Sequence, residues 1–585
     1  MTFDTLKIKA NRQPVHVVAL DLDGCDLTFG TAPCTASAAA GAECYETFKT
    51  CQDQPNYDKV TKSLYFSDTV GDILRDATIP RIYPVLENIS IAPTKITPNK
   101  GLGHRARVTL TLRDFPDHDR GTDPYVSTRS YIASDQGTFF GKLLARNPHY
   151  YARPMRVKIG YLDESGLDLA ADFIEQTFLI EKIQGPDKSG KVKITGLDPL
   201  FLADGLKAQA PVQSEGELSA PITISATSLT LKTGQGAAYD ASGEIRVNEE
   251  IITYASRAGD TFNTLTRGAW GTDAAEHDTD DGAQQCLVYQ SAAVEAVVED
   301  LMATYAAIDA SYIPSLDWAD EGTEWLAAYS LTNIISEPTA VNELLAEIME
   351  QTGTVIWWDG EAAEIKLKAL VPRDPAAATP TLTDDVHFVD GKADVTDETD
   401  QRISQVWVHY SPSNYLEYSE DKNFRYALVR GDLTSEVPAA YAKPAIKRIY
   451  ARWLDTGAQA TQVASRLLSR FNDPPKTIKF QLDMKDSALK TGQHFYIASE
   501  LIQGVDGAPL ELEMQTLLSQ YDYRTGLLKY EALSFGFKED RLARVAPSGS
   551  ADYTAASAPD VARYAWACET VSEEMSNGDA PYTVF

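Results

Sequence analysis

Four of the six cysteines lie within 27 residues near the N-terminus, and their thiols are the groups in this sequence best suited to bind a metal. Cys25, Cys34, Cys44 and Cys51 are separated by eight, nine and six residues, which is too wide for a zinc site built on paired CxxC ligands. Four thiolates from one stretch of chain can still surround a tetrahedral zinc ion or an iron–sulfur cluster. The alternative is one or two disulfides, which need an oxidising compartment, and the N-terminus has no apolar signal-peptide core that would predict export.

Two aspartates precede the first cysteine in a pattern that resembles a different site. Asp21-Leu22-Asp23-Gly24 follows a hydrophobic run, as in the nucleophile strand of haloacid-dehalogenase phosphatases, which reads DxDGT. That chemistry requires a parallel sheet with helices between its strands, whereas residues 31–58 form a loop of small residues. We expect the aspartates to lie at a strand end and turn. Since the sequence contains no nucleophile elbow, HExxH, P-loop or dinucleotide fingerprint, we expect no enzymatic activity.

The segments after the cysteines have the two-residue period of half-buried strands. In residues 106–113, Val108, Leu110 and Leu112 alternate with polar side chains, which predicts one apolar face. Further strands are predicted at 155–163, 178–185 and 192–200, with a helix at 139–147. Residues 60–205 are therefore predicted to form an antiparallel sheet domain or barrel.

A composition change near residue 210 predicts a joint, followed by a compact β-module over residues 218–288. Glu276, His277 and Asp278 in its charged loop could be imagined as metal ligands. Because one histidine among scattered acids fits no known ligand spacing, we expect a solvated turn.

The next region is predicted to be partly helical. Helical spacing of apolar residues predicts helices over 292–309 and over 339–353, the second from a Thr339 cap to Gly353. A hairpin should follow, turning at Asp359-Gly360, with at least one of its two adjacent tryptophans in the core. The acidic run 383–400 is expected to be a solvated connection.

The remaining folded sequence, about 400–540, contains several predicted strands and a helix at 459–471. The fold class is therefore predicted to be mainly β with α+β parts, in several domains. The predicted division is a cysteine segment 1–58, a β-domain 59–210, an inserted β-module 211–290, a helix-rich domain with a hairpin 291–400, a second β-domain 401–544 and a C-terminal arm 545–585.

The charge excludes a general nucleic-acid binder. With 84 acidic and 53 basic residues, the formal net charge is −31, which does not suit broad contact with phosphate backbones. Such a chain could line a passage through which nucleic acid slides without sticking. No apolar run approaches the ~18 residues of a membrane helix, so we expect no stable membrane anchor.

Two segments resemble a known family. CDLTFGTAPC…CYETFKTCQDQPNYD is similar to the N-terminal cysteine signature of central baseplate or tail-tip hub proteins of long-tailed, siphovirus-like bacteriophages and gene transfer agents. TLTRGAWGTDAAEHDTDDGA looks like the small β-domain often found in such proteins, and the order of the two segments also fits.

The resemblance implies a structural hub in the virion, at the tip of the phage tail, assembled in the bacterial host cytoplasm. It implies a homotrimer with tube-like β-barrel domains in quasi-sixfold arrangement around the DNA channel, with DNA only as passing cargo. The implied partners are the distal tail protein, tail-tip or fibre proteins and the tape-measure protein. It further implies a [4Fe-4S] cluster on Cys25, Cys34, Cys44 and Cys51, with zinc as the alternative, and leaves Cys286 and Cys568 without a ligand role.

Two other functions remain open at this point. One is a tail-associated enzyme, either a cell-wall hydrolase or the phosphatase suggested by Asp21 and Asp23. The other is a host-carbohydrate-binding module at about 218–288.

Overall fold

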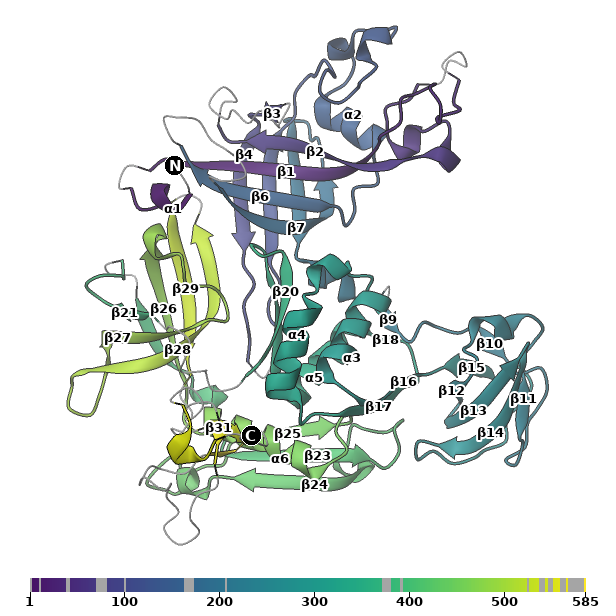
Figure 1. Ribbon diagram of the computed structural model, residues 1–585, viewed down its shortest axis with the longest axis vertical. Coiled ribbons are helices and arrows are strands. Elements are labelled where there is room, and N and C mark those ends of the chain that lie inside the picture. The colour runs from purple at the N-terminus through teal and green to yellow at the C-terminus, as the bar shows by residue number, and fades with distance from the viewer. Residues whose placement is uncertain are drawn as a thin grey trace.

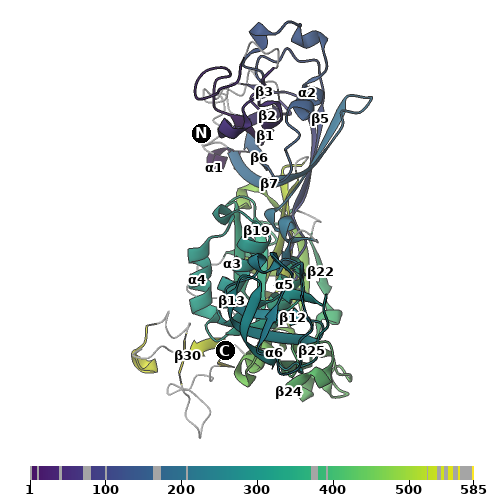
Figure 2. The ribbon, with the colours of Figure 1, turned by 90° about the vertical axis from the view of Figure 1, so that its right-hand side faces the viewer.

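The computed structural model shows a mainly β protein of several domains, as predicted (Figure 1). It describes the following residues: 3–9, 12–37, 43–69, 81–98, 102–162, 173–205, 208–370, 380–389, 393–522, 525–535, 542–545, 551–557, 564–566 and 583–584. In two views at right angles, a first sheet domain lies above a central α/β body (Figures 1 and 2). No helix in the described part of the chain is long and apolar enough to cross a membrane.

The first domain is a curled half-barrel of eight strands in the order β3-β2-β1-β6-β7-β8-β5-β4. All its strand pairs are antiparallel except β2 with β3. The strands are β1 (Pro14–Cys25), β2 (Lys59–Ser67), β3 (Ile82–Tyr83), β4 (Leu86–Ala92), β5 (Arg107–Arg113), β6 (Pro154–Tyr161), β7 (Phe173–Gln184) and β8 (Lys191–Leu197).

The alternation predicted for residues 106–113 is confirmed in β5. Val108, Leu110 and Leu112 are fully buried, while the residues between them are partly exposed. They pack with Val18 and Leu20 of β1 in one hydrophobic cluster. The helix predicted at 139–147 is α2 (Phe139–Arg146), and its two phenylalanines join the same cluster.

The inserted β-module is a separate six-stranded sheet in the order β10-β15-β12-β13-β14-β11, on the right of Figure 1. Its strands are β10 (Gly216–Glu217), β11 (Ser228–Thr230), β12 (Gly243–Val247), β13 (Glu250–Ala258), β14 (Thr261–Ala269) and β15 (Gly282–Gln285). It has a hydrophobic core of its own, which includes Ile245, Ile252 and Phe262.

Among the described residues, the central body contains four α-helices, two antiparallel strand pairs and a small mixed sheet. The helices are α3 (Val294–Asp300), which continues as a π-helical turn (Leu301–Tyr305), α4 (Ser315–Glu321), α5 (Val341–Thr352) and α6 (Gly457–Phe471). β16 (Leu287–Ala292) pairs with β17 (Leu331–Ile335) across the intervening helices, and β19 (Thr354–Asp359) forms a hairpin with β20 (Glu364–Ala369). The sheet has the order β24-β23-β25, from β23 (Gln405–Pro412), β24 (Phe424–Gly431) and β25 (Ile446–Ala451).

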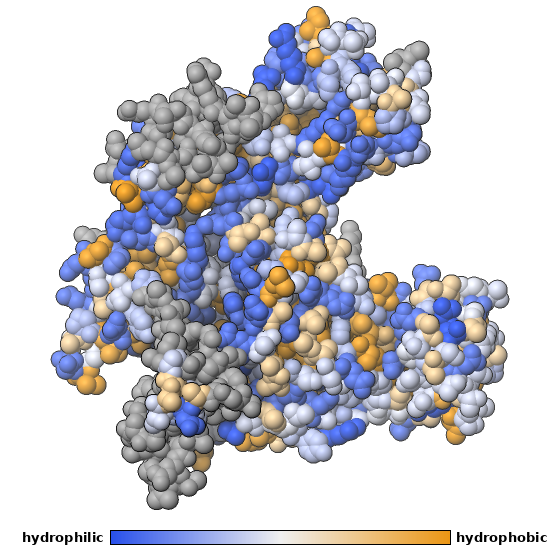
Figure 3. Space-filling model, in the orientation of Figure 1, coloured by the Kyte–Doolittle hydropathy of each residue, from blue (hydrophilic) through white to orange (hydrophobic). Residues whose placement is uncertain are grey.

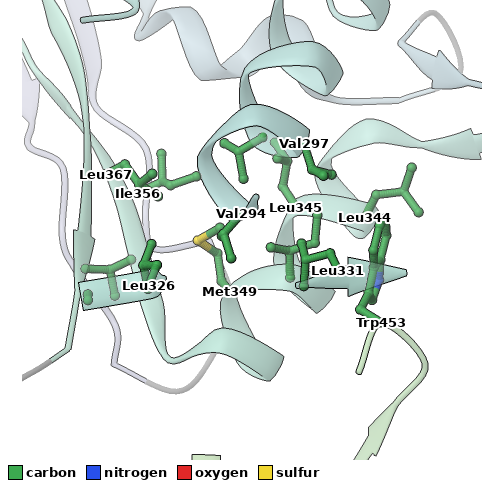
Figure 4. Close-up of a cluster of buried hydrophobic side chains, with 14 of the residues drawn as sticks. Val294, Val297, Leu326, Leu331, Leu344, Leu345, Met349, Ile356, Leu367 and Trp453 are labelled. Carbon is green, nitrogen blue, oxygen red and sulfur yellow. The ribbon is translucent and has the colours of Figure 1, made fainter. Parts of the chain in front are cut away.

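One hydrophobic cluster joins these elements although they are far apart in sequence. Figure 4 shows Val294 of α3, Leu344 of α5 and Ile356 of β19 in it, together with Trp453. Both tryptophans of the β19–β20 hairpin are buried, as the adjacent-residue argument predicted for at least one of them.

The second large sheet has six strands in the order β21-β27-β28-β29-β26-β22. They are β21 (Thr381–Thr383), β22 (Asp394–Asp397), β26 (Lys476–Asp483), β27 (His494–Gln503), β28 (Pro509–Asp522) and β29 (Leu527–Ser534). Its core is continuous with Phe3 and Leu6 of α1 (Phe3–Leu6) and with Ile159 and Tyr161 of β6. The two large sheets thus pack against each other through the N-terminus.

Short strands complete the described chain. β9 (Gln209–Ala210) pairs with β18 (Thr339–Ala340) and ties the joint near residue 210 to the start of α5. β30 (Leu542–Val545), β31 (Tyr564–Ala565) and β32 (Thr583–Val584) form a small sheet in the C-terminal region.

Two local expectations were wrong. Thr339 does not cap α5, because it belongs to β18, and Ala340 stands at the cap position without a side-chain bond. The predicted end at Gly353 is confirmed, with φ of 65° in the left-handed region that glycine adopts without strain. The acidic run 383–400 is more than a solvated connection, since its residues 394–397 form β22 and pair with β26.

The residues predicted as the second β-domain, 401–544, are divided between two parts of the structure. Residues 405–471 supply β23, β24, β25 and α6 of the central body, whereas β26 to β29 build the second sheet. At the other end of the chain, β1 lies within the segment predicted as 1–58 and pairs with β2 over nine residues.

Candidate cofactor site

The four clustered cysteines lie at one end of the first sheet. Cys25 is the last residue of β1, and its backbone N–H donates to the carbonyl of Glu46 at 2.8 Å. Cys51 follows a single 3₁₀ turn, Phe48–Thr50. Cys25 and Cys44 are buried, Cys34 and Cys51 are half-buried, and all four are free thiols. No disulfide joins any two of these four residues in the structure.

The loop brings the thiols close enough to affect one another electrostatically. Burial raises the pKa of Cys44, and the neighbouring Cys51 and Cys25 raise it further. Burial also raises the pKa of Cys51, again with contributions from Cys25 and Cys34. Two backbone N–H groups donate to sulfur, Glu46 to Cys44 Sγ at 3.3 Å and Asp53 to Cys51 Sγ at 3.4 Å. Such bonds to sulfur stabilise thiolate and tune iron–sulfur clusters.

A buried hydroxyl next to the thiols lacks a partner. The Tyr57 hydroxyl is buried and makes no hydrogen bond within the described residues. Burial, then Cys25, Asp23 and Cys51, raise the pKa of Tyr57 to about 12, so it is a neutral donor that faces the cysteines. A buried donor without an acceptor is costly, and a sulfur-rich group between the cysteines would give it one.

The spacing of the thiols bears on which group they fit. In the described part of the chain, no three His, Cys, Asp or Glu side chains converge tightly enough to hold a single metal ion. In a [4Fe-4S] cubane each thiolate binds a different iron, so its ligands stand further apart than around one ion. The described residues therefore contain no preformed site for a single metal ion.

Cationic side chains hold the cysteine loop onto the sheet domain. Arg129 donates to the Cys44 carbonyl at 2.6 Å and pairs with the buried Asp123 at 2.8 Å. The guanidinium groups of Arg129 and Arg146 each lie 4.1 Å from the ring centroid of Tyr45. These contacts hold Cys44 and Tyr45 in place, and sequence spacing gave no sign of them.

The two aspartates of the DLDG segment are structural. β1 is a central strand of an antiparallel sheet, so the parallel α/β sheet of a phosphatase is absent from the described chain. Arg156 donates to both carboxylate oxygens of Asp21 at 2.7 Å, and Ser63 donates at 2.5 Å. Burial lowers the pKa of Arg156, but the hydrogen bond and charge of Asp21 outweigh this and raise it. Asp23 pairs with Arg153 and Lys59.

Asp21→Asn is therefore expected to lower stability by about 2 kcal/mol, because it removes the negative partner of a largely buried guanidinium. It should leave hydrolysis of p-nitrophenyl phosphate at background, as in the unmodified protein. Thermal melts and the assay, with the exposed Asp26→Asn as the matched control, check both points. Phosphatase turnover that disappears in Asp21→Asn would restore the enzymatic hypothesis.

A second polar centre, which the sequence analysis missed, lies inside the β-module. Glu250 is fully buried and accepts from Arg267 at 2.7 Å through both oxygens, from His277 at 2.8 Å and from two backbone N–H groups. Burial would raise the pKa of Glu250, but the hydrogen bonds from Arg267, Ala275, Gly268 and His277 lower it to about 2.

His277 thus corrects the expectation of a solvated turn, since it is buried and bonded to Glu250. Gly268 belongs to the same centre. Its φ is 60°, and a Cβ there would meet the Thr272 carbonyl oxygen at 2.8 Å. The residues Arg267, Gly268 and His277 of the TRGAWGT…H pattern are therefore held by one carboxylate.

Comparison with known proteins gives structural likenesses at low identity. A scan of protein-family models found no match, and a search of curated proteins found none either. The structure matches a tail protein from Neisseria meningitidis MC58 at 11% identity and a TM-score of 0.37, over 77% of this chain and 91% of that one. It matches the prophage tail protein gp18 from Listeria monocytogenes EGD-e at 9% and 0.34, over 78% and 90%. It also matches a chain of a native gene transfer agent particle at 13% and 0.29, over 56% and 86%.

Proposed function

We propose that this protein is a structural component of a phage tail, namely the hub of the baseplate at the tail tip. In this role it joins the tail tube to the receptor-binding apparatus and surrounds the channel through which DNA leaves. The proposal rests on the family resemblance of the cysteine and TRGA segments and on one structural observation, which is the pair of large β-sheets packed side by side.

The contacts between the two sheets support a fixed pair. Besides the shared core around Tyr161, Arg12 pairs with Asp483 at 2.6 Å and Lys95 pairs with Glu531 at 2.7 Å. The Ile96 N–H donates to the Leu517 carbonyl at 2.9 Å. A protomer with two β-domains in contact supplies six such domains when three copies close into a ring, which matches a sixfold tube.

The charge suits a DNA channel in this proposal. A net charge of −31 repels phosphate, so DNA would pass as cargo without tight binding. Partners in this role are the distal tail protein, the tape-measure protein and the tip or fibre proteins.

Purified tail tips are expected to contain three copies of this chain. Native mass measurement of the assembled tip, calibrated on a tail protein of known copy number, checks the stoichiometry. Six copies, or one copy in the particle, would contradict the trimer. Salt-sensitive tight binding of DNA by the purified hub would contradict the passing-cargo role.

We further propose that Cys25, Cys34, Cys44 and Cys51 hold a [4Fe-4S] cluster whose role is structural. The loop that they would cross-link is rich in Ala, Gly and Thr, and it contributes few buried apolar side chains of its own. A cluster bound to four thiolates would supply the cross-links that an apolar core otherwise provides. The convergent free thiols and the unpartnered Tyr57 hydroxyl support this assignment.

Two assays separate the structural role from the other functions. The hub should give no clearing on peptidoglycan zymograms, and the isolated module of residues 211–290 should show no saturable binding on an array of bacterial surface glycans. Clearing would favour a cell-wall hydrolase. Saturable glycan binding would assign host recognition to the module.

A further inference from the structure

A cavity of about 530 Å³ lies in the first sheet domain, beside the cysteine loop. Its walls come from β1 and β2, from α2, from the 120–124 loop and from residues 45–47, which follow Cys44. Pockets that bind small molecules in proteins commonly enclose ~300–1,000 Å³. The cavity therefore has the size of a ligand site.

The floor of the cavity is apolar. Leu22 and Phe139 are buried members of the first sheet's core, and Leu64 and Leu143 pack against that core from the cavity side. On the surface of the first sheet domain, at the top of Figure 3, apolar residues lie among hydrophilic ones. Such a floor favours an acyl or aromatic body over a sugar or a nucleotide.

Most charges in the walls are already paired. Lys62 pairs with Glu46, while Lys142 and Arg146 pair with the buried Asp119 at 3.1 and 2.8 Å. The carboxylates of Asp23 and Asp123 are likewise engaged, with Arg153 and Arg129.

Arg120 is the charged lining residue that has no oppositely charged partner within the described residues. Its side chain is exposed. The lining contains four basic residues, Lys62, Arg120, Lys142 and Arg146, and three acidic residues, Asp23, Glu46 and Asp123, so one positive charge is in excess. In a chain of net charge −31, a cavity with an unpaired cation at its edge attracts an anion that other surfaces repel.

We infer that this cavity binds an amphiphile that has an apolar chain or ring system and a single anionic head group, either a carboxylate or a phosphate. The apolar body would lie on Leu22, Leu64, Phe139 and Leu143, and the head group would face Arg120. This site goes beyond the hub function and does not depend on a group bound by the cysteines.

The test uses the full-length protein and the fluorescent probe 1-anilinonaphthalene-8-sulfonate, which combines an aromatic body with one anion. We expect one saturable site per chain. Dodecanoate and dodecyl phosphate, each below its micelle concentration, should displace the probe. Dodecyl maltoside should displace it more weakly, and dodecyltrimethylammonium should not displace it. Comparison of displacement by dodecanoate with displacement by dodecyl phosphate distinguishes a free fatty acid from a lipid phosphate as the ligand.

Three variants localise the binding. Leu143→Trp should fill the cavity and abolish binding without a change in melting temperature. Arg120→Gln should weaken the anionic ligands about fivefold and leave dodecyl maltoside unchanged. Arg107→Gln, which changes an exposed arginine on β5 outside the cavity, is the matched control.

Thr122→Phe, in the 120–124 loop that also lines the cavity, replaces the filling variant if Leu143→Trp does not fold. Absence of saturable binding would overturn the inference. Binding that survives a folded filling variant, or equal binding of anionic and cationic amphiphiles, would overturn it as well.

Discussion

Cys44→Ser is expected to yield a colourless protein, whereas the unmodified protein, purified without oxygen, should be brown. The expected absorption is broad and lies at about 400 nm, with about four irons per chain, as for a cubane bound by four thiolates. Cys44 is the most informative of the four positions because it is buried, accepts an N–H bond on its sulfur and is held by Arg129 at its carbonyl. Loss of this ligand should release the iron and expose the loop of residues 43–58 to proteases.

Equivalent losses are expected for Cys25→Ser, Cys34→Ser and Cys51→Ser. Cys286→Ser is the matched control, because Cys286 is also buried and free but lies between the β-module and the central body. Burial raises the pKa of the Cys286 thiol, as it does for Cys44 and Cys51, so the control tests a thiol in a similar environment away from the loop. Cys568→Ser, outside the described residues, should also leave the iron content unchanged.

Metal analysis separates the possible results. If the unmodified protein is colourless and contains one zinc per chain, the assignment of the four ligands would stand and the iron–sulfur cluster would be refuted. A metal-free protein whose thiols pair as disulfides would refute both. Loss of colour in Cys286→Ser would show that the ligand set is wrong.

Arg267→Met is expected to destabilise the β-module by about 3 kcal/mol. The change leaves the fully buried Glu250 without its cation, and a buried charge that loses its partner costs far more than the pair itself contributes. Hydrogen exchange measured by mass spectrometry should show faster exchange across β12 to β14, while the central body is unchanged, because the module has its own core.

Arg246→Met is the control for this prediction. Arg246 is in the same module but pairs with the exposed carboxylates of Glu249 and Glu337, so its loss should cost under ~1 kcal/mol. Acid gives a second measure of the pair. The folded pKa of Glu250, about 2, is below its ordinary value of 4.5, so its stabilisation is present above pH 4.5 and is lost as the pH falls toward 2. Glu250→Gln should remove this acid dependence. Equal exchange in both arginine variants would mean that the pair is not structural.

Several features of the fold followed from local sequence. The two-residue alternation of Val108, Leu110 and Leu112 is sufficient to predict β5 and its buried face, because side chains on a strand alternate between two sides. The end of α5 at Gly353 and the turn at Asp359-Gly360 are likewise set by the residues themselves. The cysteine count and spacing limited the candidate site to four residues before any contact was known.

The partners of those residues could not be read from the sequence. Asp21 and Asp23 match the sequence pattern of a catalytic strand. Their role depends on Arg156 and Arg153, which are more than a hundred residues away in sequence and lie on, or just before, the neighbouring strand β6. The short hydrogen bond of His277 is made to Glu250, which is on β13 and not in the histidine's own loop. An ion pair needs two groups that the fold brings together, and periodicity carries no information about that distance.

The same limit applies to larger units. The sequence predicted two β-rich regions, but residues 405–471 joined the central body because their apolar side chains complete the core that contains Trp453. The acidic residues 394–397 became an edge strand because β26 offered unpaired backbone groups, which accept a strand of almost any composition. Local sequence determined which segments are strands and helices and which thiols could bind a cofactor. Tertiary structure alone decided which strands pair, which charges are neutralised and where a cavity remains, because each of these depends on contacts between distant residues.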